Sequence, residues 1–229
     1  MIDISSFFNH TLPQYCLLCG GIPEQGALCR ACEADLPHAP AARCPRCALA
    51  NPAGTLCGRC LRRPPAFDAT YAAFDFLFPL DELLRRYKYQ GLLAVGATSA
   101  DLMLKALPNS ALPQRLLPMP LHPERLKERG FNQAAELAKR LGWHLGIPVN
   151  TDACQRIRHT APQAGLSLKD RLKNLRGAFT CDEDLSGCHI ALIDDVMTTG
   201  SSLNELAKAV KQAGAARIDC WVVARAQRE

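Results

Sequence analysis

The sequence predicts an α/β protein, in which a mostly parallel β-sheet flanked by helices follows a small metal-binding domain. Two observations support this prediction. From about residue 66 onward, short apolar runs alternate with helical segments, which is the pattern of strands joined by helices. Before that point, eight cysteines fall into four Cys-x-x-Cys pairs. We therefore expect one domain at 1–65 and a second at 66–229.

Length and composition fit this division. A chain of 229 residues can hold one medium-sized domain and a small appendage. With 48% hydrophobic and 21% charged residues, the chain has the composition of a folded globular protein. No apolar run is long enough to cross a bilayer, and residues 1–10 lack the basic and apolar parts of a signal peptide. The expected location is therefore the cytoplasm.

The cysteine pairs have the spacing of metal ligands. The second four cysteines repeat the first four at a constant offset of 28 residues. Each Cys-x-x-Cys turn presents two sulfurs from one tight knuckle, and two knuckles complete a tetrahedral Cys₄ site. Zinc is favoured because no iron–sulfur spacing is present, and we expect two structural Zn²⁺ ions with sequential, not interleaved, pairing. The predicted ligands are Cys16, Cys19, Cys29 and Cys32 for one site and Cys44, Cys47, Cys57 and Cys60 for the other.

This cysteine-rich unit has almost no apolar core, so the metal would supply most of its folding free energy. Its expected role is that of a structural cap. The alternative role is docking or nucleic-acid binding, which six arginines keep open: Arg30, Arg43, Arg46, Arg59, Arg62 and Arg63. Overall charge does not favour nucleic acid, because two zinc ions and eight thiolates reduce the formal charge of +5 to about +1. Cysteines without ligand spacing are expected to be free thiols in or near the core: Cys154, Cys181, Cys188 and Cys220.

The second domain has clear strand and helix signals. Strands are predicted at 67–76, 115–119, 189–193 and 218–224, and helices at 81–89, 92–107, 133–145 and 203–213. Lys88, near the end of the first of these helices, either belongs to a solvated basic face or reaches a phosphate. A basic loop at 121–132 precedes a helix N-terminus and predicts an anion site there.

A second basic stretch runs from Arg156 to Arg176, just before the strand at 189–193. It carries six cations against one acid, and Arg171 lies within it. Charge runs of this kind are usually solvated, but the position in the chain also fits a lid over the neighbouring site.

The strand at 189–193 leads into the most informative segment. Asp194 and Asp195 follow the apolar run, and a small turn rich in hydroxyls and glycine then leads into a helix. Backbone N–H groups at a helix N-terminus suit a phosphate, and Gly200 lets the backbone approach it closely. The acidic pair would repel the phosphate itself, so we expect it to bind a sugar's paired hydroxyls or Mg²⁺. The alternative is a turn whose hydroxyls merely cap the helix.

That segment resembles the phosphoribosyl pyrophosphate (PRPP) loop of type I phosphoribosyltransferases. The resemblance lies in an apolar strand, Asp-Asp, two further residues, Thr-Gly and a hydroxyl residue. A Walker A pattern is absent, which argues against a nucleotide triphosphatase. The resemblance implies that PRPP is bound by the acidic pair, Asp194 and Asp195, and by the loop residues Val196, Met197, Thr198, Thr199, Gly200, Ser201 and Ser202.

Over nearly its whole length the chain resembles the ComF (ComFC/GntX) family. The marks are the Cys₄ ribbons, Pro-x-Pro-Leu-His at 118–122, Arg-Gly-Phe-Asn-Gln at 129–133, the basic segment with Arg171, and the PRPP loop. The resemblance implies a type I phosphoribosyltransferase fold with PRPP and Mg²⁺ as ligands. Members of the family are bacterial cytoplasmic proteins that assist the uptake of single-stranded DNA during natural competence, so the resemblance implies the same role here. It adds Arg129, Asn132, Gln133 and Arg171 as candidate substrate-binding residues, beside Lys88, whose place at a helix–helix corner already made it a candidate.

The expected reaction is displacement of pyrophosphate from C1 of PRPP by an acceptor that the sequence does not identify. Asp194 and Asp195 are the candidate catalytic residues. One alternative is a non-catalytic adaptor that senses PRPP and binds single-stranded DNA, with Tyr87, Tyr89 or Phe131 stacking on bases. Another is a nucleobase-salvage enzyme of nucleoside metabolism with no connection to DNA uptake.

Overall fold

The computed structural model describes residues 15–24, 26–107, 112–158 and 175–227. Its centre is a four-stranded sheet in the order β1-β6-β5-β2, in which every neighbouring pair is parallel. The strands are β1 (Ala69–Asp75), β2 (Arg115–Pro118), β5 (His189–Met197) and β6 (Arg217–Arg225). Because the strands are parallel, their carboxyl ends meet at one edge, where open α/β sheets bind ligands.

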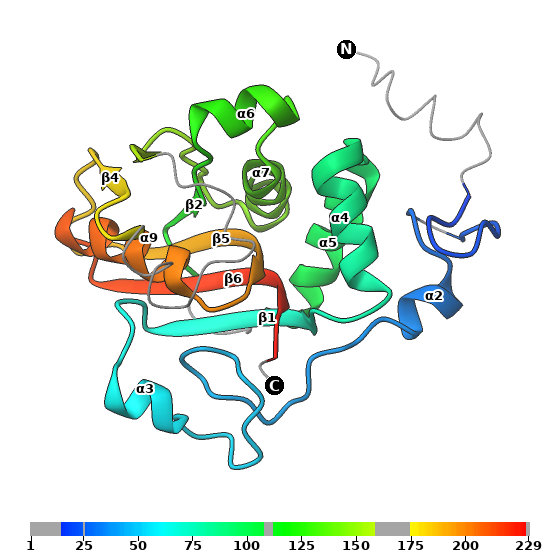
Figure 1. The fold of residues 1–229 in the computed structure, drawn as a ribbon, viewed down its shortest axis with the longest axis horizontal. Coiled ribbons are helices and arrows are strands. Elements are labelled where there is room, and N and C mark those ends of the chain that lie inside the picture. Colours follow the sequence, from blue (N-terminus) through cyan, green and yellow to red (C-terminus); the bar gives the residue numbers. More distant parts are fainter. Residues whose placement is uncertain (1–14, 25, 108–111, 159–174, 228–229) are drawn as a thin grey trace.

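Helices cover both faces of the sheet, and Figure 1 shows α4 and α5 together at one end with α9 and β4 at the other. Helices α4 (Leu80–Gln90), α5 (Leu93–Ala106) and α7 (Gln133–Leu145) share one apolar cluster with one face of β5 and β6. Helix α9 (Ser201–Gln212) and the antiparallel hairpin β3 (Cys154–Arg156) and β4 (Phe179–Cys181) pack on the opposite face. Because both faces of the sheet are covered in this way, β5 and β6 are buried along nearly their whole length.

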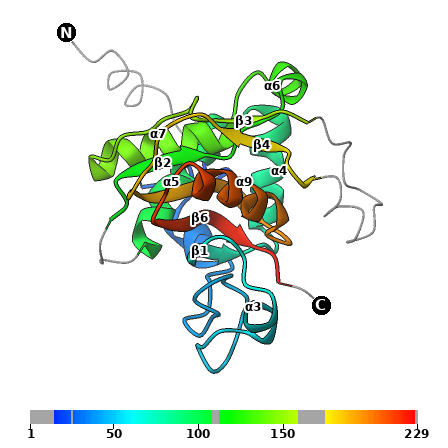
Figure 2. The same ribbon diagram turned by 90° about the vertical axis from the view of Figure 1, so that its left-hand side faces the viewer.

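The second of the two cysteine-rich ribbons lies at the β1 edge of the sheet, and the first lies against α4 and α5. Each contains one short helix, α2 (Arg30–Ala34) in the first and α3 (Gly58–Arg62) in the second. Both views place the second ribbon beyond β1 (Figures 1 and 2). The ribbon is attached there by hydrogen bonds, because Thr70 of β1 donates its amide to the Pro45 carbonyl and its hydroxyl to the Arg46 carbonyl.

The predicted fold class is confirmed, and the main elements begin and end within a few residues of their predicted bounds. Three features differ. The basic loop predicted at 121–132 is mostly a helix, α6 (Pro123–Arg129), which His122 caps. The hairpin β3–β4 was not predicted, because each strand has only three residues. Strand β5 does not end before the acidic pair but continues through it to Met197, because pairing with β6 extends that far.

Most of the basic segment between Arg156 and Arg176, including Arg171, lies outside the described residues. Its two described ends are in contact, since Arg158 donates to the Arg176 carbonyl at 3.3 Å. No helix in the described part of the chain is both long and apolar enough to span a membrane.

Candidate phosphate-binding site and metal centres

The loop between β5 and α9 lies at the carboxyl edge of the sheet. Gly200 adopts a left-handed conformation, with φ at +76°, and α9 begins at the next residue. This conformation favours glycine because a Cβ atom would clash with the following carbonyl. Helix α9 has no acidic residue in its first turn, and its N-cap residue, Gly200, provides no side-chain cap. Its N-terminus therefore keeps the partial positive charge that binds an anion.

Three consecutive carbonyls of this loop are held by arginines. The Arg225 guanidinium donates to the Met197 carbonyl at 2.9 Å and to the Thr198 carbonyl, and Arg59 donates to the Thr199 carbonyl at 3.0 Å. In a trans peptide the C=O and the following N–H point in opposite directions. The amides of Thr198, Thr199 and Gly200 are therefore turned away from the arginines.

Within the described residues, those three amides have no hydrogen-bond acceptor. Successive free amides in a turn form a concave anion site. Hydroxyl groups lie beside them, since Thr199 Oγ1 and Ser201 Oγ are 2.7 Å apart and the Ser201 amide donates to Thr199 Oγ1 at 3.2 Å. The alternative, in which the hydroxyls only cap the helix, explains the hydrogen bond of the Ser201 amide but not the orientation of the three amides before it. Met197, in contrast, is buried in the core (1% exposed) and presents only its backbone here.

The acidic pair is divided between the two faces of the sheet, as expected for successive residues of a strand. Asp195 is 3% exposed and lies on the helical α4 side, where Lys88 Nζ is 2.7 Å from its Oδ2. This contact is an ion pair without the alignment of a good hydrogen bond. Lys88 thus reaches a carboxylate in the structure, which neither sequence alternative for this lysine had included. Asp195 also accepts the Val196 amide at 2.8 Å.

Asp194 is half-buried and has no ion pair among the described residues. Burial, and then the neighbouring negative charge of Asp195, raise the pKa of Asp194, and Lys88 offsets part of this rise. Positive charge approaches Asp194 from β3, because Arg156 interacts with it electrostatically. Burial and the nearby charge of Arg125 lower the pKa of Arg156, while Asp194 opposes that shift. A ligand cation or a sugar hydroxyl would stabilise the charged form of Asp194 and so offset the rise in its pKa.

Asn132 and Gln133, two predicted residues at the start of α7, differ in whether their side chains already have hydrogen-bond partners. Asn132 caps α7 by accepting the Ala134 amide at 3.0 Å, and its Nδ2 donates to the Met119 carbonyl at 3.1 Å. Its side chain is therefore already occupied by structural hydrogen bonds. Gln133 is 5% exposed, and its Oε1 has no hydrogen-bond partner among the described residues. A buried acceptor without a partner costs free energy, so Gln133 is the better of the two for contact with a ligand.

Arg129 lies at the end of α6 with its guanidinium 5.3 Å from the centre of the Tyr89 ring. Tyr89 is 70% exposed. Tyr87 is fully buried and Phe131 packs on it with ring centres 5.4 Å apart, so Tyr87 is not available to stack on bases. Of the three aromatics considered for that role, Tyr89 alone is widely exposed.

The eight predicted metal ligands form two groups, and the sequential pairing is confirmed. One group is Cys16, Cys19, Cys29 and Cys32, the other is Cys44, Cys47, Cys57 and Cys60, and within each group the sulfurs lie within 4.8 Å of one another. Tetrahedral zinc with Zn–S bonds of about 2.3 Å requires sulfurs roughly 3.8 Å apart. The Cys19–Cys29 and Cys47–Cys57 sulfur distances are both 3.7 Å, so the cysteines fit structural zinc.

In both sites a backbone amide donates a hydrogen bond to the sulfur at the equivalent position, which stabilises the thiolate form that binds metal. The Cys29 amide donates to Cys16 Sγ at 3.3 Å, and the Cys57 amide donates to Cys44 Sγ at 3.4 Å. Burial by itself would raise these two pKa values, but the amide donors outweigh it and lower the pKa of Cys16 to about 6 and that of Cys44 to about 7. Both thiols are thus close to the thiolate form that binds zinc.

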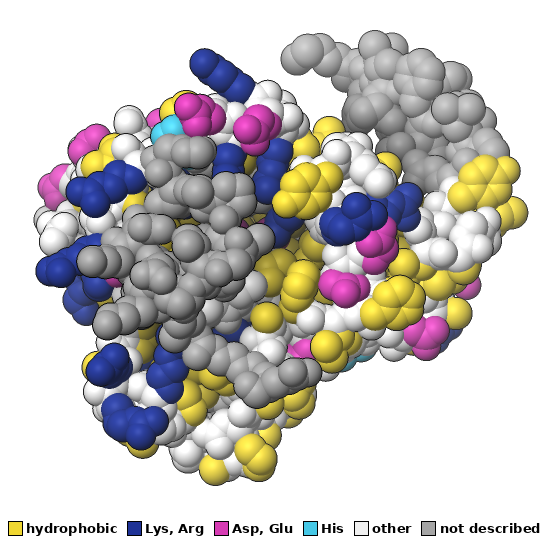
Figure 3. All heavy atoms as spheres, in the orientation of Figure 1, with side chains coloured by type: hydrophobic (Ala, Val, Ile, Leu, Met, Phe, Trp, Pro, Cys, Tyr) yellow, Lys and Arg dark blue, Asp and Glu magenta, His cyan; other side chains and the backbone are white. Residues whose placement is uncertain are grey.

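A basic cleft of about 650 Å³ separates the second ribbon from residues 198–200, the loop between β5 and α9 that is called the phosphate loop below. Its lining includes Arg59, Arg62 and Arg63 on one side and Thr199 and Asn204 on the other. Figure 3 shows Lys and Arg side chains gathered over α3. The sequence named these arginines as a possible interaction surface but gave no sign that they adjoin the phosphate loop. Arg225, the residue that holds this loop, had no sequence signal and is revealed only by its contacts.

Comparison with known proteins gives the same two parts. A model of the double zinc ribbon domain matches residues 7–61, and a model of the phosphoribosyl transferase domain matches residues 126–229. Competence protein F of Haemophilus influenzae is 34% identical over 96% of this chain and 99% of its own length.

Two further relatives extend the comparison. The DNA utilization protein YhgH of Salmonella typhi is 33% identical over 94% of this chain and 98% of its own length. Competence protein ComFC of Bacillus subtilis is 26% identical over 82% of this chain and 80% of its own length. The chain therefore belongs to the ComF family, in which an N-terminal double zinc ribbon precedes a phosphoribosyltransferase domain.

Proposed function

We propose that this protein binds PRPP as its Mg²⁺ complex at the carboxyl edge of the sheet and transfers the phosphoribosyl group to an acceptor. The observation that carries the proposal is the row of three amides at Thr198, Thr199 and Gly200, which have no acceptor within the described part of the chain and lie ahead of α9 and beside two carboxylates. The amides and hydroxyls would hold the 5′-phosphate of PRPP. Asp194, which has no ion pair with any residue that the structure describes, would accept hydrogen bonds from the ribose hydroxyls.

In the proposed reaction, a nucleophile forms a bond to C1 of the ribose while the bond from C1 to pyrophosphate breaks. Positive charge develops on the sugar ring and negative charge on the departing pyrophosphate. Asp194 would stabilise the former, and Arg129 at the end of α6 is placed on a segment that could approach the latter. Mg²⁺ would neutralise pyrophosphate charge, and Asp194 offers a hard oxygen ligand of the kind that it prefers.

Lys88 has a supporting role in this proposal. Two adjacent carboxylates would repel a polyanion, and the ion pair between Lys88 and Asp195 removes one of the two negative charges. The net charge next to the phosphate loop is then close to that of Asp194 alone. Lys88 would thus reduce the repulsion that PRPP meets without itself occupying the phosphate site.

The test is calorimetric titration of the zinc-loaded protein with PRPP in the presence of Mg²⁺. Asp194→Asn is the better variant, because Asp195 is held in a buried ion pair and its replacement would also affect folding. We expect Asp194→Asn to lower PRPP affinity at least tenfold, and the exposed control Asp152→Asn to leave it unchanged. Equal affinities in all three proteins would refute the assignment of this site.

Turnover needs a separate measurement. Pyrophosphate release is followed with PRPP, Mg²⁺ and a panel of free bases, and we expect release with at least one acceptor. A good acceptor among common nucleobases would favour a salvage enzyme. No release with any base, although PRPP binds, would favour a PRPP-sensing protein without catalysis.

A second candidate function is the binding of single-stranded DNA, which the basic cleft favours. Arg62 and Arg63 are exposed at its rim, next to the apolar surface of Pro64 and Pro65. Phosphate contacts by such arginines make affinity fall steeply with salt. We expect oligothymidine binding measured by anisotropy to weaken in the double variant R62A/R63A, with a shallower salt dependence. Binding that is insensitive to this variant would place any DNA elsewhere.

The names of the relatives suggest a role for this chain in competence or DNA utilization. We propose that it supports the uptake of single-stranded DNA together with uptake proteins. The direct test is expression in a Haemophilus influenzae strain that lacks its competence protein F. Restored transformation by the wild type, and not by Asp194→Asn, would join the competence role to the PRPP site.

A further inference from the structure

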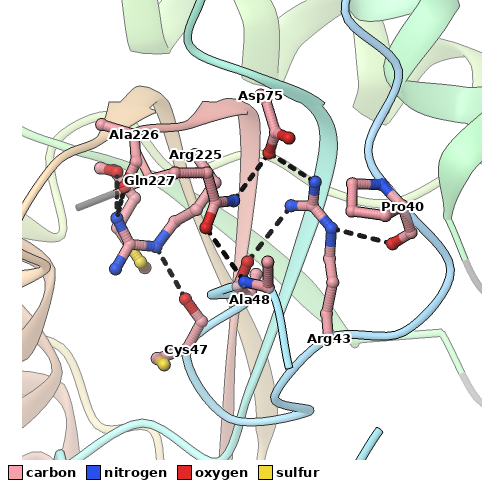
Figure 4. Close-up of polar contacts among 10 residues, drawn as sticks. Pro40, Arg43, Cys47, Ala48, Asp75, Arg225, Ala226 and Gln227 are labelled. Atoms are coloured by element: carbon pink, nitrogen blue, oxygen red, sulfur yellow. Dashed lines mark hydrogen bonds and ion pairs between the residues drawn. The ribbon is translucent and has the colours of Figure 1, made fainter. Parts of the chain in front are cut away.

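One buried arginine links the second cysteine site to the phosphate loop. Arg225, at the end of β6, is 0% exposed. Its Nε donates to the carbonyl of the metal ligand Cys47 at 2.7 Å, and its Nη1 donates to the Met197 carbonyl at 2.9 Å, as well as to the Thr198 carbonyl. A single planar side chain thus fixes a peptide of the cysteine knuckle against two consecutive peptides of the loop. Figure 4 shows this guanidinium directed at Cys47.

Arg59 makes a second link between the same two segments. It lies in α3 between the ligands Cys57 and Cys60, and its Nη2 donates to the Thr199 carbonyl at 3.0 Å. The ligand Cys57 caps α3 and the ligand Cys60 lies within it, so the position of Arg59 depends on both ligands. Together, Arg225 and Arg59 hold the three carbonyls whose orientation turns the Thr198, Thr199 and Gly200 amides toward a ligand.

The turn that carries Cys44 and Cys47 is itself held to the end of the sheet by hydrogen bonds and an ion pair, so its position is fixed relative to the strands. Arg43 forms an ion pair with Asp75 at 2.5 Å and donates to the Ala48 carbonyl at 3.1 Å. Gln227, two residues after Arg225, accepts the Ala50 amide at 2.9 Å and donates to Asp75 at 2.6 Å (Figure 4). The second ribbon therefore contacts both the loop and the strand ends beside it.

The first ribbon provides an internal comparison. At the offset of 28 residues, Ala31 occupies the position of Arg59. The contacts of the first ribbon are with helices α4 and α5 instead, since Arg86 donates to the Leu17 carbonyl at 2.8 Å and Lys105 pairs with Glu33 at 2.6 Å. Among the described residues, no hydrogen bond joins the first ribbon to the phosphate loop. The two sites are chemically alike but differ in what they support.

Electrostatics also favours a bound metal beside Arg225. A buried guanidinium is costly unless negative charge or oriented dipoles compensate it. Four thiolates and one Zn²⁺ carry a formal charge of about −2 next to this cation. Loss of the metal would remove both this charge and the fixed position of the Cys47 carbonyl.

We propose that the second cysteine site is a positioning device for the phosphate loop, with Arg225 and Arg59 as positioning residues. Zinc at this site holds the three loop amides in the ligand-binding orientation, and loss of zinc here, but not at the first site, releases them. The effect on PRPP affinity rests on the function proposed above. The effect on the loop itself does not.

The first test compares arginine variants of the zinc-loaded full chain by hydrogen–deuterium exchange of residues 198–203 without ligand. We expect Arg59→Ala to speed exchange in this segment about fivefold, the factor that corresponds to one lost hydrogen bond. Arg30→Ala, which removes an exposed arginine of the first ribbon, should stay within twofold of the wild type. Arg225→Lys should exceed Arg59→Ala, because it removes bonds to two loop carbonyls. Indistinguishable exchange in Arg59→Ala and Arg30→Ala would overturn the proposal.

The second test compares ligand variants at equivalent positions of the repeat, Cys29→Ser and Cys57→Ser, with metal content measured for each. We expect Cys57→Ser to raise exchange at 198–203 and to weaken PRPP binding tenfold or more, and Cys29→Ser to leave loop exchange within twofold. Equal loop exchange in the two variants would contradict the proposal. If Cys57→Ser does not fold, the Arg59→Ala comparison decides. If the wild type does not bind PRPP, the proposed function fails while the exchange results still decide the coupling.

Discussion

The ammonium group of Lys88 lies 2.7 Å from the Asp195 carboxylate, which joins helix α4 to the strand that carries the acidic pair. The lysine side chain is 23% exposed and the carboxylate 4%, so the two groups are only partly screened by water. The chain thus places one carboxylate in an ion pair inside the protein and leaves its neighbour, Asp194, for the opposite face.

Replacement of Lys88 by Met leaves a buried carboxylate without its partner. We expect Lys88→Met to lower the free energy of unfolding by about 2 kcal/mol, which is below the usual loss for a fully buried pair because Lys88 is partly exposed. Urea unfolding of the zinc-loaded protein measures this loss. The control is Lys139→Met, whose ion pair with Glu136 is exposed (59% and 40%) and should contribute about 0.5 kcal/mol or less.

Addition of Asp195→Asn to Lys88→Met should restore part of the lost stability, because no charge is then left unpaired. A loss from Lys88→Met no larger than that from Lys139→Met would show that the ion pair is not maintained in solution.

The pH dependence of stability tests Asp194. Its pKa is raised in the folded protein by burial and by Asp195, so between the unfolded and folded pKa values the folded state binds more protons. This contribution to stability is present at low pH and is lost as pH rises through the folded pKa. Each unit of elevation corresponds to about 1.4 kcal/mol. We therefore expect Asp194→Asn to gain stability relative to the wild type as pH increases.

The measurement is urea unfolding of both proteins, saturated with zinc, at several pH values between about 5.5 and 8. Loss of zinc at acid pH affects both proteins alike, so the difference between them isolates Asp194. A difference that is constant with pH, or that shrinks as pH rises, would mean that the pKa of Asp194 is not raised.

Zinc removal tests the ribbons. We expect metal analysis to find two Zn²⁺ per chain, in agreement with the two groups of four cysteines. Because the ribbons have little apolar core, chelation should abolish exchange protection at 15–65, and β5 and β6 should keep theirs. Hydrogen exchange before and after treatment with a chelator shows this. If the ribbons keep the same protection without metal, side-chain packing contributes more than the metal to their folding.

Gly200→Ala tests the turn ahead of α9. An added Cβ would make only ordinary contacts, 3.6 Å to Met197 Sδ and 4.0 Å to Phe67, so the cost comes from the backbone conformation at φ +76°. We expect a loss of about 1 kcal/mol in unfolding free energy and weaker PRPP binding. Gly58→Ala is the matched control, because it lies in helix α3 and a Cβ there meets no atom within 4 Å. Equal effects of the two substitutions would show that Gly200 is not constrained.

Much of this protein could be predicted because its signals are local. The Cys-x-x-Cys spacing fixes which sulfurs share a knuckle, and the offset of 28 residues predicted sequential pairing. The strand, acidic pair, turn and helix at 189–212 are adjacent in the chain, so their order alone predicted where an anion site would form. Helix α7 begins and ends at the predicted residues, Gln133 and Leu145.

Other features arise between segments that are far apart in the chain, and no local pattern encodes them. Lys88 and Asp195 are separated by more than a hundred residues, and the sequence favoured a solvated lysine over a phosphate contact without indicating an ion pair. Hairpin β3–β4 is too short to produce a periodic signal and depends on packing against α9. Helix α6 was missed because its charged residues were interpreted as a loop.

The sequence by itself determined the two-part architecture, the ligands of both metal sites and the position of the candidate phosphate loop, because each depends on residues that are neighbours along the chain. Only the tertiary structure decided that Arg59 and Arg225 fasten the second metal site to that loop, since Arg225 and Cys47 come from opposite ends of the chain. It also decided that the acidic pair is unequal, because strand geometry directs Asp194 and Asp195 to opposite faces and α4 supplies a cation to one face alone.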